Sequence, residues 1–299
     1  MKPGWYILNY HDISWEENAY ERAIGGNFPP DIFRAHVQTL SRAARLVSVA
    51  EGLRRWQQGA VDEPLVSFWF DDGLAGVRRY ALPLLAGQGV TAAMSVCSRF
   101  MLRQEFFWRF KLAFLTRGDG LRFLRSRLRP LGFASGMSLR AFTLDHFGAE
   151  VLAAIDAVYT QFTAAHDRQD AFRLFDDVAG MAALRDAGWE IANHSAAHYP
   201  VSEESYLDHF AGQFGECEQA LNAHLGLSSR FWVLPFARQP HLAGRLADAF
   251  AAAQPGDRIL VLMGARRNIA AQPQGGLLYR FYPPLVDGPG LLRYLRSTP

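Results

Sequence analysis

The fold of this chain is decided by two stretches, LVSFWFDDG at residues 65–73 and WEIANHSAAH at residues 189–198. Each begins as an apolar run with aromatic or β-branched residues, which is typical of a buried β-strand. Each then changes abruptly to acidic or histidine side chains. Buried parallel strands that end in polar residues are typical of α/β barrels, whose functional side chains gather at the carboxyl ends of the strands.

Similar strand-like runs recur along the chain, with helical spacing between most of them. Because strand and helix alternate, we predict a parallel sheet or barrel. The seven predicted strands are residues 5–9, 65–70, 91–97, 189–193, 231–236, 259–263 and 277–282. The predicted helices include residues 30–46, 74–86, 178–187, 203–225 and 241–253.

The span of about residues 100–175 has helical spacing and no strand-like run, so we predict a helical insertion between the third and fourth strands. We find no internal repeat, low-complexity tract or linker that would separate two domains. The chain has 299 residues, of which 49% are hydrophobic, enough to bury a large core. We therefore expect a single domain over residues 1–299.

Composition also narrows the chemistry and the compartment. The chain has only two cysteines, Cys97 and Cys217, which lie far apart, so neither a disulfide framework nor a thiolate metal site is expected. The opening MKPGWYILNYHDI has no long hydrophobic region and no small-residue cleavage site. We therefore expect a cytoplasmic protein.

Residues 99–129 hold nine basic residues against two acidic ones, although the whole chain has a net charge of only +2. Aromatic residues are interleaved with these charges. One interpretation is peripheral contact with the inner membrane surface or with a phosphate-bearing substrate. The alternative is a set of amphipathic helices with an aromatic core face and a solvated arginine face.

Asp71 and Asp72 follow a strongly apolar run, where two adjacent carboxylates repel each other and are costly to desolvate. A metal ion would relieve both problems: one carboxylate would bind the ion, and the other would take a proton from water. The alternative is a turn or a helix N-cap, which Asp-Asp-Gly also suits.

His194 and His198 are four residues apart, so a helical turn after the strand would place both imidazoles on one side. Two histidines and one carboxylate leave metal coordination open for water, as hydrolysis requires. The alternative is a surface histidine pair. Without thiolates, the set suits Zn²⁺, with Co²⁺, Ni²⁺ or Fe²⁺ as alternatives. Tyr10-His11-Asp12 and Pro235-Phe236, at two other strand ends, are expected at the same mouth.

The motifs FDDG at residues 70–73 and NHSAAH at residues 193–198 resemble the two main motifs of the polysaccharide deacetylase family, also called the NodB-homology or carbohydrate esterase family 4 group. The resemblance implies a distorted seven-stranded parallel (β/α) barrel. It also implies that Asp72, His194 and His198 bind the metal and that Asp71 is the general base. The opening LNYHDI is similar to the branch that includes poly-N-acetylglucosamine deacetylases, which places His11 beside the site.

The chain departs from the family pattern in three places. Trp69 stands where the first motif usually has Thr or Ser, and the Arg-x-Pro-Tyr wall is reduced to residues 234–236, Leu-Pro-Phe. Asp71 is therefore expected to lack its usual arginine neighbour. No histidine follows His241, so the late Leu-x-His motif has no counterpart. Leaving-group protonation is then expected from His11, another group or solvent.

Two further features are interpreted from the residues alone. Arg280, in the last strand, is expected to be a cation that faces the site. The second acidic pair, Asp176-Asp177, is interpreted as a helix N-cap.

We therefore expect a metal-dependent hydrolase that removes N-acetyl groups from an amino sugar in a glycan or glycan precursor. Pro235 and the backbone N–H of Phe236 are expected to contact the substrate or its oxyanion. The substrate is expected to be lipid- or nucleotide-linked, in surface polysaccharide or O-antigen assembly, with no nucleic-acid partner. Two alternatives stay open: a deformylase or other amide hydrolase, and a catalytically idle glycan-binding homologue.

Overall fold

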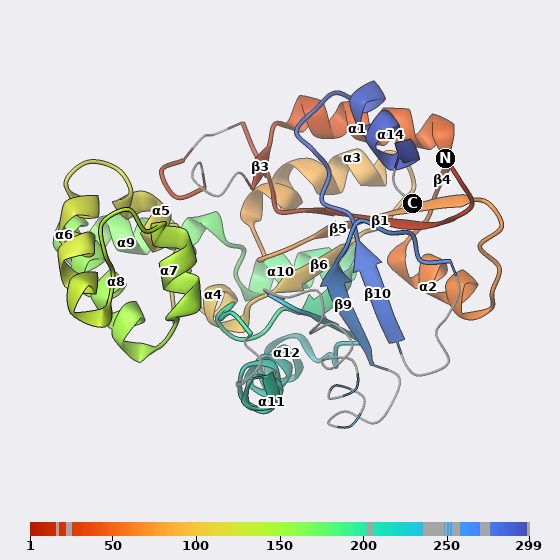
Figure 1. The fold of residues 1–299 in the computed structure, drawn as a ribbon. Coiled ribbons are helices and arrows are strands. Elements are labelled where there is room, and N and C mark those ends of the chain that lie inside the picture. The colour runs from red at the N-terminus through yellow and green to blue at the C-terminus, as the bar shows by residue number, and fades with distance from the viewer. Residues whose placement is uncertain are drawn as a thin grey trace.

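The computed structural model describes residues 1–15, 18–21, 26–201, 206–235, 248, 250, 252, 258–269 and 276–297. Within these residues, eight parallel strands form one sheet, and seven of them make up its continuous path (Figure 1). Their order across the sheet is β1 (Gly4–Tyr10), β5 (Pro64–Phe70), β6 (Ala93–Val96), β7 (Glu190–Asn193), β8 (Phe231–Val233), β9 (Ile259–Met263) and β10 (Gly276–Arg280).

The two edges of this sheet approach each other. The backbone of Phe281, directly after β10, accepts a hydrogen bond from Asn9 and donates one to Ile7, both at 2.7 Å. The sheet is therefore a nearly closed barrel, and the seven-stranded parallel α/β fold predicted from the sequence is confirmed.

Three short strands were not predicted. β4 (Arg45–Leu46) pairs with β5, and β2 (Asp12–Ile13) pairs with β3 (Asn27–Phe28) in a separate sheet. Two-residue strands are too short to leave a period in the sequence. β8 is shorter than predicted and ends at Val233, two residues before Pro235.

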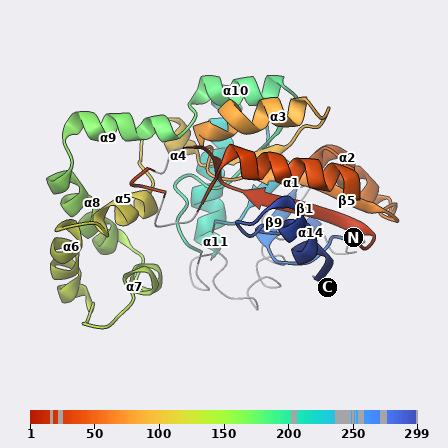
Figure 2. The ribbon, with the colours of Figure 1, turned by 90° about the horizontal axis from the view of Figure 1, so that it is seen from above.

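Helices cover the outside of the barrel (Figure 2). They are α1 (Pro30–Ala43), α2 (Val49–Gln57), η1 (Val77–Ala81) continuing into α3 (Leu82–Ala86), α10 (Val178–Asp186), α11 (Tyr206–His209), η4 (Phe210–Phe214) continuing into α12 (Gly215–Leu225), and α14 (Gly288–Ser297). Asp177 caps α10 by accepting a hydrogen bond from the Gly180 N–H at 3.1 Å, as predicted. Asp176 instead pairs with Arg78 at 2.8 Å. The helix predicted at residues 241–253 lies almost wholly outside the described residues.

Strand alternation divides the buried side chains between two sides of the sheet. On β1, Tyr6, Leu8 and Tyr10 pack into the layer beneath the helices. Trp5 and Ile7 point the other way, into the cluster that fills the barrel. The same alternation holds on β5, where Leu65 and Trp69 belong to the barrel cluster. The next residue of that parity, Asp71, therefore leaves the strand on the inner side.

The segment between β6 and α10 forms a helical lobe on one side of the barrel (Figure 1). Its elements are α4 (Ser98–Met101), α5 (Trp108–Leu115), α6 (Gly120–Leu128), η2 (Arg129–Leu131), α7 (Leu139–Asp145), α8 (Ala149–Phe162), α9 (Ala165–Ala171) and η3 (Phe172–Leu174). The lobe has its own aromatic cluster, which includes Phe106, Phe110 and Tyr159. These rings are at most 5% exposed, so Phe106 and Phe110 of the basic segment are core, whereas Phe123 of the same segment is 38% exposed.

Several basic side chains of residues 99–129 form ion pairs with acidic residues of the lobe or the barrel. Arg99 pairs with Glu216 at 2.6 Å, and Lys111 pairs with Asp156 at 2.7 Å. Among the residues described, no helix combines the length and apolar character needed to cross a bilayer.

Candidate active site

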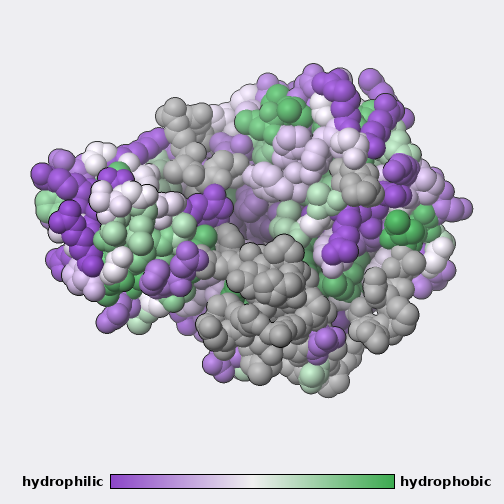
Figure 3. Space-filling model, viewed as in Figure 1, coloured by the Kyte–Doolittle hydropathy of each residue, from purple (hydrophilic) through white to green (hydrophobic). Residues whose placement is uncertain are grey.

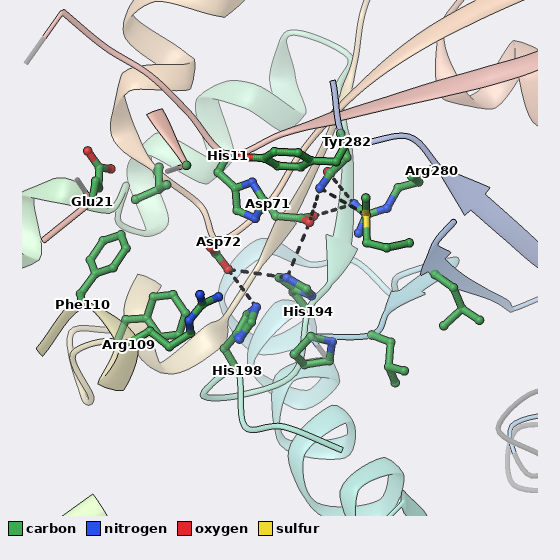
Figure 4. Close-up of a pocket in the computed structure, with 18 of the residues that line it drawn as sticks. His11, Glu21, Asp71, Asp72, Arg109, Phe110, His194, His198, Arg280 and Tyr282 are labelled. Atoms are coloured by element: carbon green, nitrogen blue, oxygen red, sulfur yellow. Dashed lines mark hydrogen bonds and ion pairs between the residues drawn. The ribbon is translucent and has the colours of Figure 1, made fainter. Parts of the chain in front are cut away.

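The polar residues after several strands meet at one mouth of the barrel. Asn9 is on β1, Asp71 follows β5, His194 follows β7, and Arg280 ends β10. Each has the parity of the inner side chains on its strand: Ile7, Trp69, Ala192 and Leu278 all belong to the cluster inside the barrel. Residues that are far apart in the sequence are thereby directed toward one point (Figure 4).

Three side chains form a compact set of candidate metal ligands. Asp72 Oδ1 lies 3.6 Å from His194 Nε2 and 3.4 Å from His198 Nε2. The potential ligand atoms of this set all lie within 4.8 Å of one another, and the three residues are at most 3% exposed. A carboxylate and two imidazoles are a donor set that suits Zn²⁺ and similar divalent ions.

The backbone around these ligands adopts a conformation that non-glycine residues rarely take. The φ angles of Asp72, Ser195 and His198 are 71°, 71° and 56°. Such conformations persist where the surrounding structure imposes them, often at functional sites. The segment from His194 to His198 is therefore a tight turn, not the helical turn that the four-residue spacing suggested.

Two hydrogen bonds shape this turn. The Ser195 N–H donates to Asn193 Oδ1 at 2.9 Å, and the His198 N–H donates to Ser195 Oγ at 3.1 Å. The two imidazole rings still converge, with centroids 4.6 Å apart and planes nearly perpendicular.

His194 forms a hydrogen bond with the barrel, and His198 is contacted by the lobe. His194 Nδ1 lies 2.8 Å from the Val233 carbonyl, to which it can only donate, so Nε2 is the nitrogen left with a lone pair toward Asp72. Trp108, on α5, donates from Nε1 to the His198 carbonyl at 3.1 Å. The Phe107 ring packs against the His198 ring at 4.8 Å. The lobe therefore supports one side of the ligand set.

Asp71 lies in a dense polar network beside that set. Arg280 Nη1 donates to Asp71 Oδ1 at 2.7 Å and also to Asn9 Oδ1 at 2.8 Å. Asn9 Nδ2 donates to Asp71 Oδ2 at 2.8 Å, and Ser95 Oγ donates to Asp71 Oδ1. The expectation that Asp71 lacks an arginine neighbour is wrong, because the last strand supplies one.

Trp69, the unusual residue of the first motif, belongs to the same network. Its indole N–H donates to Ser95 Oγ at 3.1 Å, and the Arg280 guanidinium lies 5.2 Å from the centroid of its ring. Cation–π contact of this kind favours Arg280 in its buried position. Trp69 therefore helps to position the two groups that contact Asp71.

The two neighbouring carboxyl groups have opposite electrostatic environments. Burial opposes ionisation of Asp71, but Arg280, His194 and His11 outweigh it and lower the pKa of that carboxyl. Burial, followed by the charge of Asp71, raises the pKa of Asp72 to about 8. Asp72 Oδ1 accepts no hydrogen bond from the described residues. A buried carboxylate oxygen of this kind, facing two imidazole nitrogens, fits a divalent cation.

A cavity of about 430 Å³ opens onto these groups. It is lined by Asp71, Asp72, His194 and His198, together with His11, Pro235 and Arg280. Figure 3 shows the molecular surface hollowed between the lobe and the strands, with hydrophilic residues inside the hollow. Phe236, the expected source of an oxyanion-binding N–H, lies outside the described residues.

Several cavity residues were not found by sequence reasoning. Asn9 directly precedes the predicted Tyr10-His11-Asp12 segment, and its inward parity on the strand could have indicated it. Tyr282 follows Arg280 by two residues, and its ring packs against His11 at 5.6 Å. Arg109 and Arg140 come from the lobe, and no pattern in the sequence indicates that they reach the mouth of the barrel.

Comparison with known families identifies the chain. A sequence model of the family described as polysaccharide deacetylase matches residues 58–251, which span both motifs. The chain belongs to the polysaccharide deacetylase family. The resemblance drawn from FDDG and NHSAAH is therefore confirmed.

Solved deacetylase structures share this fold along nearly the whole chain. IcaB from Ammonifex degensii is 14% identical with a TM-score of 0.57, covering 99% of this chain and 98% of that one. A de-N-acetylase from Aggregatibacter actinomycetemcomitans is 14% identical with a TM-score of 0.59, covering 97% and 99%. The deacetylase PplD from Streptococcus pyogenes, solved with acetate, is 14% identical with a TM-score of 0.56, covering 99% of each. No curated protein sequence matches.

Proposed function

We propose that this member of the polysaccharide deacetylase family is a metal-dependent hydrolase that removes N-acetyl groups from an amino sugar. The observation that carries the proposal is the convergence of Asp72, His194 and His198, with Asp71 beside them, in one cavity. In this proposal residues 1–299 act as one catalytic unit, with residues 100–175 inserted into the barrel.

The proposed metal ligands are Asp72 Oδ1, His194 Nε2 and His198 Nε2. Zn²⁺ suits them, with Co²⁺, Ni²⁺ and Fe²⁺ as alternatives. A divalent ion held there would supply Lewis acidity and bring the pKa of water toward neutrality. The hydrogen bond from His194 Nδ1 to the Val233 carbonyl orients that ring and supports its Nε2 as a donor.

Asp71 is the proposed general base. Arg280 lies beside its oxygens and favours the charged form, so the carboxylate is available to take a proton from the attacking water. Asp71 Oδ2 is 3.9 Å from His194 Nε2, which places the base directly beside the ligand set. Asn9 and Ser95 hold the carboxylate in one orientation.

His11 is the proposed proton donor to the leaving amine. It lines the cavity, and its Nδ1 makes no hydrogen bond with the described residues, so this nitrogen is not committed elsewhere. Burial lowers the pKa of His11 to about 4, which makes its protonated form scarce near neutral pH. Turnover in this scheme is therefore slow when compared with a donor of pKa near 7.

The proposed substrate is an N-acetylated amino sugar in a glycan or glycan precursor of surface polysaccharide assembly, and the products are acetate and the free amine. Pro235 forms part of the cavity wall on which the acyl group would lie. Purified protein with a measured metal content should release acetate from N-acetylated sugars, and a chelator should stop it. Release of formate alone from N-formyl sugars would identify a deformylase. Loss of the metal with unchanged turnover would overturn the proposal.

A further inference from the structure

Two arginines from the lobe line the cavity that contains the candidate ligands. Arg109 is on α5, and Arg140 is on α7. Figure 4 shows Arg109 with its guanidinium directed toward Asp72 and His198. These arginines belong to the helical insert, whereas the candidate ligands and Asp71 all follow barrel strands.

The two arginines line the same cavity, so their like charges oppose each other. Burial, followed by the like charge of Arg140, lowers the pKa of Arg109 to about 10. Arg109 still carries its charge at neutral pH. Arg140 is an exposed residue at the cavity, and its side chain makes no hydrogen bond or ion pair with a residue that the structure describes. Two guanidinium groups that repel each other beside one cavity are stabilised when an anion lies between them.

Three acidic residues are among the described residues that line the cavity, and none of them belongs to the lobe. Asp71 is already paired with Arg280. Asp72 is the proposed ligand of a divalent cation, and its charge is committed there. Glu21 also lines the cavity, but burial and the charge of Asp12 raise its pKa to about 8, so it is mostly uncharged at neutral pH. Among the described lining residues, the lobe therefore contributes two arginines and two phenylalanines and no acidic side chain.

We propose that Arg109 and Arg140 form a subsite for an anionic group of the substrate, a carboxylate or a phosphate, next to the N-acyl group that is hydrolysed. This inference rests on the proposed function, because it places the anion on the same sugar or on its neighbour. Arginine is suited to this task because its planar guanidinium binds carboxylate and phosphate oxygens in pairs. The barrel would supply the chemistry, and the lobe would select acidic substrates.

Binding to an inactive, metal-loaded Asp71→Asn variant tests the subsite without turnover. The ligands are a neutral N-acetylhexosamine, an N-acetylhexosaminuronic acid and an N-acetylhexosamine 1-phosphate, each titrated calorimetrically. We expect at least one anionic sugar to bind about tenfold tighter than the neutral one, with Arg140→Gln removing most of that preference. The uronic acid and the phosphate distinguish the two sources of the anion.

Arg127→Gln is the matched control, because Arg127 is an exposed arginine of the lobe that does not line the cavity. It should leave all three affinities unchanged. Equal binding of neutral and anionic sugars would overturn the subsite, as would an equal loss for all three ligands in Arg140→Gln or an equal effect of Arg127→Gln. Acetate release by the unmodified protein is measured separately. Failure of that assay with a retained anion preference would refute the proposed reaction but not the subsite.

Discussion

Arg280 and Asp71 form an ion pair of 2.7 Å inside the barrel, with both side chains at most 4% exposed. The two residues are 209 positions apart in the chain: Asp71 directly follows β5, which pairs with one side of β1, and Arg280 ends β10, whose next residue bridges to the other side of β1. Because Asp71 also accepts hydrogen bonds from Asn9 and Ser95, one carboxylate joins residues from four strand regions. Because Arg280 ends the strand that closes the barrel, the ion pair that holds the candidate base depends on this closure.

Replacing Arg280 with methionine should impair both activity and folding. Asp71 would become a buried carboxylate without its main counter-charge, which typically costs about 3–5 kcal/mol of unfolding free energy. We expect kcat to fall at least tenfold, with partial recovery in Arg280→Lys because the charge returns. Kinetics and denaturant unfolding of the two variants measure this. Unchanged kcat in a folded Arg280→Met protein would show that Asp71 does not depend on Arg280.

Asp71→Asn and Asp72→Ala should separate catalysis from metal binding. Asp71→Asn removes the proposed base but none of the proposed ligands, so we expect full metal content and a kcat about 10²–10⁴-fold lower. Asp72→Ala removes one of three ligands, so tight metal binding should be lost. Metal analysis of both proteins, alongside acetate release, provides the comparison. Full turnover in Asp71→Asn would refute the assignment of the base.

Trp108→Phe should weaken metal binding from outside the ligand set. The substitution keeps an aromatic ring on α5 but removes the indole donor to the His198 carbonyl. Because that bond supports the turn on which His198 lies, we expect metal affinity to fall about tenfold. Competition with a chromophoric chelator measures the affinity. As a matched control, Trp56→Phe alters a buried tryptophan of α2, outside the cavity, and should not change the affinity.

Stability should decrease in mild acid, partly through His209. Burial lowers the pKa of His209 to about 4 in the folded protein, whereas the unfolded chain takes up this proton near pH 6.5. The unfolded state therefore binds more protons between these values, and the free energy of unfolding falls as pH decreases from about 6.5 to about 4. His209 should account for about 2 kcal/mol of this loss between pH 7 and pH 5.

Denaturant unfolding at these two pH values tests the contribution of His209. His209→Leu should show a pH dependence smaller by that amount, because leucine cannot take up a proton. His224→Leu is the control, since His224 is an exposed histidine on α12. If both variants kept the pH dependence of the parent protein, the buried ring of His209 would not be its source.

Much of the fold could be predicted because strands and their ends leave local signals. The runs at residues 65–70 and 189–193 are mostly apolar and are followed directly by Asp71-Asp72 and by His194, so strand and site residues are adjacent in the sequence. Parallel strands bring their carboxyl ends to one side of a barrel, which made the convergence of these residues predictable. The Asp177 cap was equally local, because it involves residues only three apart.

The sequence by itself determined the seven strands, the carboxylate and imidazole pairs at their ends, and the family to which the chain belongs. Only the tertiary structure decided that Arg280 neutralises Asp71, that Trp69 packs beneath that arginine, that His198 lies on a left-handed turn, and that Arg109 and Arg140 reach the cavity. The physical reason is that strand periodicity and capping act between near neighbours, whereas these contacts depend on how the barrel closes and where the lobe packs. No local pattern encodes a distance between residues that are so far apart in the chain.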